Sequence, residues 1–229
     1  MKIALCLYGL QGNLRGKSGS FDILPEDKSN IKIMELAYSY WNKYFLSKYD
    51  IDVYIHSWEP KLKKELIKLY KPIKYKFEEQ KIFDIPTHVL GSHERKQSHY
   101  SRWYSQFECN NLRNESNQKY DFIMMSRFDM AWSKNINFED LKPGCLYYPG
   151  DYLHNNHSKK IQDLFHISED KIMDKFCDLY NKIGEYTKLH TKFTNNAAAG
   201  ISSHRISKYH IIKLGIKYDA LLYRRQKHK

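Results

Sequence analysis

Cysteine is scarce in this sequence. The 229 residues hold four, at positions 6, 109, 145 and 177, and none of them forms a C-x-x-C pair. This spacing argues against a structural zinc site and against a redox-active dithiol. Cys6 lies in an apolar segment, where a buried thiol is ordinary. We therefore expect a protein of a reducing compartment.

Long apolar runs are also missing. The longest are far too short to cross a bilayer. The first residues, "MKIALCLYGL", turn to glycine and polar residues before the hydrophobic region of a signal peptide develops. No internal repeat or low-complexity linker divides the chain, so we expect residues 1–229 to form a single domain with a sizeable core. We expect this domain to be soluble and cytoplasmic.

Negative charge is in short supply. The chain has 38 Lys and Arg against 26 Asp and Glu, a net charge of +12. Such a charge attracts anions, among them nucleic acid, phosphorylated small molecules and acidic membranes, without choosing between them. The basic residues are scattered, with the densest regions at 61–76 and 224–229. A lysine-rich surface that only keeps the protein soluble is the alternative interpretation.

Apolar residues alternate between strand-like and helix-like spacing. Strands are predicted at 2–10, 50–58, 73–79, 120–129, 145–149 and 163–168, and helices at 28–49, 61–70, 98–117 and 169–186, with a last helix and a closing strand within 202–223. This order predicts an α/β protein with a mostly parallel central sheet flanked by helices. Ligands of such sheets bind outside the carboxyl ends of the strands.

Polar residues gather around four of the predicted strands, at 9–15, 56–58, 126–129 and on the approach to Asp163. In a mostly parallel sheet most of these places converge. The glycine-rich loop after Gly9 leaves room for a phosphate to approach backbone N–H groups. Its spacing is neither G-x-G-x-x-G nor G-x-x-x-x-G-K-[ST], which disfavours a dinucleotide site and a P-loop. An ordinary surface loop is the alternative.

Asp129 follows the apolar strand in "YDFIMMSRFDMAW", with Arg127 two residues before it. A lone carboxylate at this place suits Mg²⁺ or Mn²⁺ held jointly by protein and diphosphate oxygens, because hard cations often take only one or two protein carboxylates. The alternative is an Arg127–Asp129 surface pair worth under about 1 kcal/mol.

Four segments taken in order, "KIALCLYGLQGN", "DVYIHSW", "SRWYS" and "YDFIMMSRFDMAW", resemble a group of small nucleotide-sugar glycosyltransferases of the A-type fold. Members of that group occur in viral and bacterial surface-glycan gene sets. The resemblance covers residues 1–135, and "KIQDLFHISEDKIMDKFCDLY" resembles a later segment of the same group. It implies a Rossmann-like fold and transfer of a sugar from a nucleotide-diphosphate sugar to a glycan or glycoconjugate acceptor. The expected compartment is the cytoplasm, or the host cytoplasm for a viral protein.

The resemblance implies roles for individual residues. The nucleotide pocket would be lined by Leu7, Tyr8, Gly9, Gln11, Asn13 and Arg15, the base or ribose by His56, Ser57 and Trp58, and the diphosphate or donor sugar by Ser101, Arg102 and Ser105. Asp129 would take the last position of a D-x-D metal motif that binds Mn²⁺ or Mg²⁺. Position 127 is Arg instead of Asp, so the motif is incomplete, and we expect Arg127 to neutralise phosphate charge.

An inverting transferase also needs a carboxylate that deprotonates the acceptor hydroxyl. Asp163 is the first candidate for this base and Asp151 the second. Capping of a turn is the structural alternative for both residues. A retaining enzyme needs no such base, and the sequence does not distinguish the two stereochemical outcomes.

Two further functions stay open. A non-catalytic basic α/β module that binds nucleic acid or an anionic glycan would use the net charge and the Arg, Trp and Tyr of residues 100–104. No recognisable nucleic-acid-binding motif supports it. A transferase fold that binds nucleotide without catalysis would account for the incomplete metal motif. The basic end "YRRQKHK" could contact a membrane, and a frayed terminus is the alternative.

Overall fold

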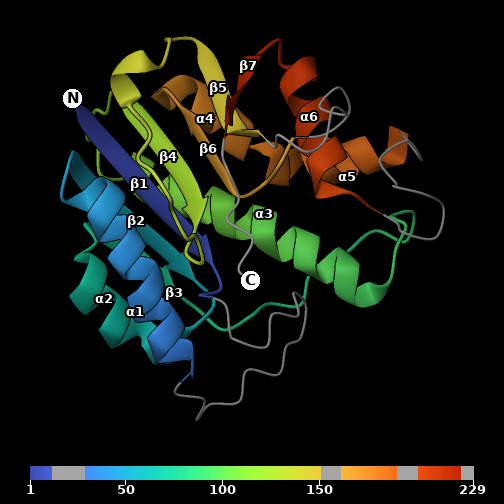
Figure 1. Cartoon of the computed structure of the whole chain (residues 1–229). Helices are drawn as coiled ribbons and strands as arrows, with labels where there is room; N and C mark the ends of the chain where they lie inside the picture. The colour runs from blue at the N-terminus through green and yellow to red at the C-terminus, as the bar shows by residue number, and fades with distance from the viewer. Residues whose placement is uncertain (12–28, 151–160, 190–200, 223–229) are drawn as a thin grey trace.

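Seven strands form one sheet with helices on both faces (Figure 1). The computed structural model describes residues 1–11, 29–150, 161–189 and 201–222. The strands are β1 (Lys2–Gly9), β2 (Asp50–Ser57), β3 (Lys74–Phe77), β4 (Phe122–Arg127), β5 (Cys145–Gly150), β6 (Phe165–Ser168) and β7 (Lys217–Leu222). The helices are α1 (Ser29–Trp41), α2 (Lys63–Tyr70), α3 (His93–Asn114), α4 (Asp170–Cys177), α5 (Leu179–Leu189) and α6 (Ser203–Lys213), with short helical turns η1 (Asn42–Leu46), η2 (Pro60–Leu62) and η3 (Phe138–Asp140).

The strand order is β3-β2-β1-β4-β6-β5-β7. β1 is parallel to β2 and β4, β2 is parallel to β3, and β5 is parallel to β7. β6 is antiparallel to both of its neighbours, β4 and β5. The prediction of an α/β protein with a mostly parallel central sheet is therefore confirmed.

Three predicted helices differ from the observed ones. Residues 28–49 form α1 followed by a single π-helical turn, η1. Helix α3 begins at His93 instead of 98, because the Ser92 hydroxyl caps it by accepting the N–H of Arg95 at 3.3 Å. The predicted helix 169–186 is divided into α4 and α5. At the joint the Asp178 carboxylate accepts the side-chain amide of Asn181 at 2.7 Å, a local bond that competes with regular helix.

The central strand β1 is buried on both faces. Ile3, Leu5 and Leu7 belong to a hydrophobic cluster shared with α1 and α2. Ala4, Cys6 and Tyr8 belong to a second cluster shared with α3, α4 and α6. This alternation is typical of a strand in a sheet covered on both sides. It also fixes which helix layer each residue at the strand end faces.

The chain leaving β4 continues this in-and-out alternation. Phe128, Met130 and Trp132 are buried in the cluster on the α1 side, whereas Asp129 between them is partly exposed. The Trp132 ring lies 4.7 Å from the ring of Phe45. The buried aromatic residues hold the segment in place. A charged residue is tolerated at position 129 because it lies on the side away from that core.

We expect Trp132→Ala to lower the free energy of unfolding by about 3–5 kcal/mol, because it removes a fully packed indole and leaves a cavity. Urea unfolding at neutral pH measures the change. Ile82→Ala is the matched control. Its side chain is 86% exposed, so the loss should stay within about 0.5 kcal/mol. Equal losses in the two variants would contradict the packing described here.

Candidate functional site

Four neighbouring strands present polar side chains in one row at their carboxyl ends. Tyr8 on β1 lies opposite His56 on β2 and Arg127 on β4. Lys76 on β3 lies opposite His56 in turn. His56 and Lys76 contact helix α3, so the row belongs to the face of the sheet that α3 crosses (Figure 1). The ends of β1, β2 and β4 therefore meet at one edge.

Asp163 reaches the same edge by a different route. β6 runs antiparallel to β4, and its first residue, Phe165, lies opposite Ser126 near the carboxyl end of β4. The segment entering β6 therefore lies where the parallel strands end. Asp163 precedes the strand instead of beginning it, because β6 starts two residues later than predicted.

Asp163 is already engaged by a cation. It forms an ion pair with Arg102 of α3 and accepts the hydroxyl of Ser203 at 3.2 Å. Burial lowers the pKa of Arg102 to about 10, which leaves the guanidinium charged at neutral pH. A carboxylate paired with arginine is a poor proton acceptor, since the cation stabilises its ionised form. The predicted role of Asp163 as a base therefore requires this pair to open.

Arg127 and Asp129 form a two-pronged ion pair. Arg127 Nε donates to Asp129 Oδ1 at 2.8 Å, and Nη2 donates to Oδ2 at 2.5 Å. Both carboxylate oxygens are bonded to Arg127, so a cation at Asp129 would have to share them with the guanidinium or displace it. Within the described ranges, no cluster of three or more His, Cys, Asp or Glu side chains is arranged to hold a metal ion.

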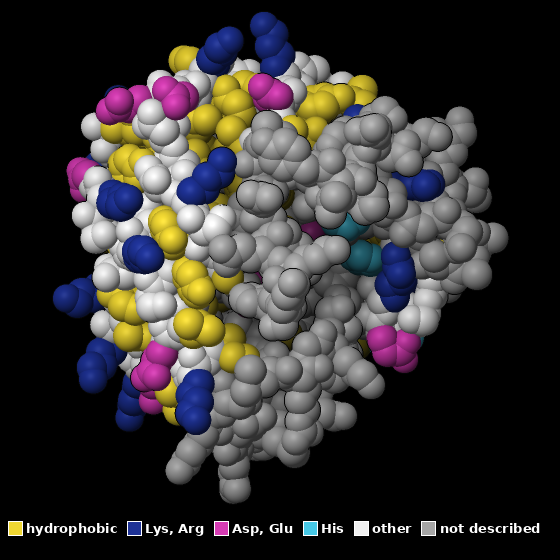
Figure 2. All heavy atoms as spheres, in the orientation of Figure 1, with side chains coloured by type: hydrophobic (Ala, Val, Ile, Leu, Met, Phe, Trp, Pro, Cys, Tyr) yellow, Lys and Arg dark blue, Asp and Glu magenta, His cyan; other side chains and the backbone are white. Residues whose placement is uncertain are grey.

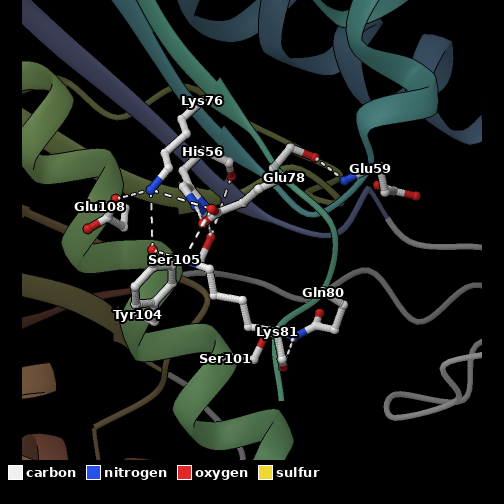
Figure 3. A network of polar contacts seen from close by, with 11 residues as sticks. His56, Glu59, Lys76, Glu78, Gln80, Lys81, Ser101, Tyr104, Ser105 and Glu108 are labelled. Carbon is white, nitrogen blue, oxygen red and sulfur yellow. Dashed lines mark hydrogen bonds and ion pairs between the residues drawn. The ribbon is translucent and has the colours of Figure 1, made fainter. Parts of the chain in front are cut away.

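His56 is held by residues from two elements (Figure 3). Its Nδ1 lies 2.6 Å from Ser105 Oγ of α3, and its Nε2 lies 3.0 Å from Glu78 Oε1. Burial lowers the pKa of His56, although Glu78 opposes that shift. The neutral ring then donates Nε2–H to Glu78 and accepts the hydroxyl of Ser105.

This alignment of serine, histidine and glutamate has the composition of a nucleophilic triad. Ser105 is fully buried, however, and lies between α3 and the sheet. A substrate cannot reach its hydroxyl there. Ser105 and Glu78 therefore fix the ring orientation of His56, and the group acts as a positioning network.

Glu78 is the centre of a wider charge network. Lys81 lies 3.1 Å and Lys76 3.5 Å from its carboxylate, and Lys76 also lies 2.5 Å from Glu108 on α3. Burial alone would raise the pKa of Glu78, but hydrogen bonds from His56 and Lys81 lower it overall. None of these lysine and glutamate residues was predicted as a site residue from the sequence. Glu78 follows the end of β3, and its role depends on contacts with distant segments that no local pattern reveals.

Glu59 ties the ends of β1 and β2 together. Its side chain is buried, and Oε2 accepts the backbone N–H of Gln11 at 2.5 Å. Burial raises the pKa of Glu59 to about 7, and the Gln11 N–H acts against that shift. Strongly shifted carboxyls at strand ends are common in functional sites. Glu59 was not predicted as a site residue, although it directly follows the predicted residue Trp58.

Several buried polar atoms at this edge have no hydrogen-bond partner among the described residues. They are the Tyr8 hydroxyl, both polar atoms of the Gln11 amide and the Trp58 indole N–H. Burial raises the pKa of Tyr8 to about 12, so its phenol is neutral. Because buried polar groups are almost always satisfied in folded proteins, these atoms suit a bound polar ligand.

The remaining predicted residues lie as follows. The Leu7 side chain packs in the hydrophobic core, which leaves only its backbone near the edge. Gly9 ends β1 with a φ of +95°, a conformation that favours glycine. Ser57 Oγ accepts the N–H of Glu59 at 3.2 Å, and Ser101 Oγ accepts the amide of Gln80 at 2.8 Å. Three predicted residues lie outside the described ranges: Asn13, Arg15 and Asp151.

Comparison with models of known protein families gives no match, and no curated protein matches the chain. Within the described residues, no helix is long and apolar enough to cross a membrane.

The raised pKa of Glu59 predicts a pH-dependent stability. Between pH 4.5 and about 7 the folded chain keeps a proton that the unfolded chain has lost. The free energy of unfolding should therefore fall as the pH rises through this window. Glu59→Gln keeps an acceptor for Gln11 and lacks the titration, so it should gain up to about 3 kcal/mol relative to wild type by pH 8.

Urea unfolding of both proteins from pH 4.5 to 8 measures this difference. Glu79→Gln, at an exposed position just after the neighbouring strand β3, is the control and should show a flat difference. A flat profile for Glu59→Gln would contradict the burial of an uncompensated carboxyl at this place.

Proposed function

We propose that the protein is a glycosyltransferase that moves a sugar from a nucleotide-diphosphate sugar to a glycan acceptor. One observation carries the proposal. Two arginines from different elements, Arg102 and Arg127, both interact electrostatically with the buried Tyr8 hydroxyl at the carboxyl ends of parallel strands. Guanidinium groups bind phosphate oxygens through paired hydrogen bonds, so two of them suit a diphosphate. The resemblance to A-type glycosyltransferases supports the same conclusion.

In this proposal Asp129 and Asp163 act as internal counter-ions. Both guanidinium groups are partly buried, and each pairs with a carboxylate of the chain that offsets the loss of water. A diphosphate replaces these partners and takes over the neutralisation. When Arg102 turns to phosphate, Asp163 loses its cation and becomes a stronger base for the acceptor hydroxyl.

Two guanidinium groups suit the charge that develops on the leaving nucleoside diphosphate. Departure of the nucleoside diphosphate places negative charge on the oxygen that linked it to the sugar. Arg127 and Arg102 stabilise that charge as it develops, without having to reorganise water. On the nucleotide, the Gln11 amide offers one donor and one acceptor to a polar edge of the base.

A divalent cation remains part of the proposal. Asp129 offers a cation two oxygens, and both are bonded to Arg127. Such a set is a poor match to a metal held by the protein alone. Mn²⁺ or Mg²⁺ would be held between Asp129 and the diphosphate and would add to the neutralisation of the leaving group.

Thermal unfolding with a panel of UDP, GDP and their sugar conjugates, each with and without Mn²⁺, tests the proposal. One nucleotide at about 100 times its dissociation constant should stabilise the fold by about 2.7 kcal/mol, seen as a rise in Tm. A larger rise with Mn²⁺ would support the shared cation. A rise with oligonucleotides alone, lost at high salt, would instead favour the non-catalytic basic module.

Turnover separates a transferase from a fold that only binds nucleotide. We expect wild type to hydrolyse or transfer the donor sugar and Asp129→Ala to lose at least about 100-fold in rate while it stays folded, since the variant lacks the carboxylate that would hold the cation beside the leaving oxygen. The nucleotide-induced rise in Tm should persist. Asp140→Ala, at an exposed position, is the control. Undiminished turnover in Asp129→Ala would remove this residue from the site.

A further inference from the structure

The surface formed by α1, α2 and the start of β3 combines positive charge with exposed apolar side chains. Seven exposed lysines lie on it, at positions 32, 43, 61, 63, 64, 68 and 71. In residues 31–46 and 61–75 the acids are Glu35, which is exposed, and Glu65, which is half-buried. Figure 2 shows Lys side chains spread over this part of the molecule. We call this surface the lysine face.

The two helices form one continuous layer. The Tyr38 ring of α1 lies 5.0 Å from the Tyr70 ring of α2, and both helices bury their inner residues in the same hydrophobic cluster. On α1 the exposed residues Lys32 and Leu36 are four residues apart, which places them on the same outward side, and the exposed Lys43 follows in η1. The lysine face is therefore a single surface built from neighbouring elements.

Apolar side chains lie between these lysines without burial. Leu36 is 58% exposed, Ile73 49% and Tyr75 41%. The Nζ of Lys63 lies 5.3 Å from the centre of the Tyr75 ring, so charge and apolar surface are in direct contact. Exposed apolar side chains among lysines on one surface suit a partner that accepts both kinds of contact.

We propose that the lysine face docks onto an anionic lipid bilayer. Lysines attract acidic headgroups, and aliphatic and aromatic side chains enter the boundary between headgroups and acyl chains. Nucleic acid would pair with the lysines but not with the apolar side chains, since a phosphate backbone offers no apolar layer for Leu36 and Ile73. The row of polar side chains at the strand ends lies on the opposite side of the sheet, which faces α3. Docking through the lysine face therefore leaves that row uncovered (Figure 1).

Vesicle flotation tests this proposal with the full chain. Phosphatidylcholine vesicles are compared with vesicles in which about a third of the lipid is phosphatidylserine. The protein should float with the anionic vesicles only, and the bound fraction should fall as salt rises. Lys63→Glu/Lys64→Glu/Lys68→Glu should weaken binding at least about tenfold. Lys134→Glu/Lys142→Glu/Lys171→Glu makes the same change in net charge at exposed positions elsewhere and should bind like wild type.

A second variant tests the apolar half of the surface. Leu36→Asn/Ile73→Asn keeps the charge and should weaken vesicle binding several-fold, while binding of single-stranded DNA should not change. Absence of binding to anionic vesicles at low salt would overturn the proposal. So would equal losses in the two lysine variants, or an unchanged Leu36→Asn/Ile73→Asn variant together with tighter binding of DNA. Thermal unfolding confirms that each variant is folded, and none of these measurements depends on glycosyl transfer.

Discussion

The contact between α3 and the carboxyl half of the sheet is the constraint on which the site depends. The side of α3 that faces the sheet is rich in polar residues, and each must find its own partner. Gln97 exchanges two hydrogen bonds with the backbone of Phe83, at 2.8 and 2.7 Å, and Ser105 meets His56 at 2.6 Å. A shift of α3 along the sheet would break these bonds together. Buried polar pairs of this kind specify one arrangement, because any other leaves groups unsatisfied.

The same principle governs the charges inside the protein. Arg102, Arg113 and Arg127 each pair with carboxylates from the chain. For Arg113 the pairing with α4 is structural, and it ties α3 to the helix that follows β6. For the two arginines at the sheet edge, the proposed function adds a second role, in which a diphosphate replaces the carboxylate. In both cases an arginine is neutralised by carboxylates of the chain. Only its position relative to the strand ends distinguishes a structural pair from a candidate binding group.

The sequence predicted the strands and their polar ends because apolar runs and the breaks after them are local signals. It could not predict that Asp163 reaches the edge through an antiparallel strand, since nothing in "DLFHIS" reveals a strand's direction. Nor could it find Glu59 and Glu78. Their roles arise from contacts with Gln11 and His56, which depend on the register between distant segments. Leu7 was predicted to line the nucleotide pocket, but its side chain packs in the hydrophobic core. Its position in the motif does not reveal which face of the sheet it occupies.

Cationic side chains occur in two settings, and the net charge of +12 does not separate them. At the sheet edge Arg102 and Arg127 are partly buried, and their planar groups can bind two oxygens at once. The exposed excess on α1 and α2 is lysine alone, whose compact charge acts through water on any anionic surface. The net charge of the chain therefore does not predict whether an anion binds at the carboxyl ends of the strands. A ligand there would be recognised by two arginines that carry no excess charge until their own carboxylates are displaced.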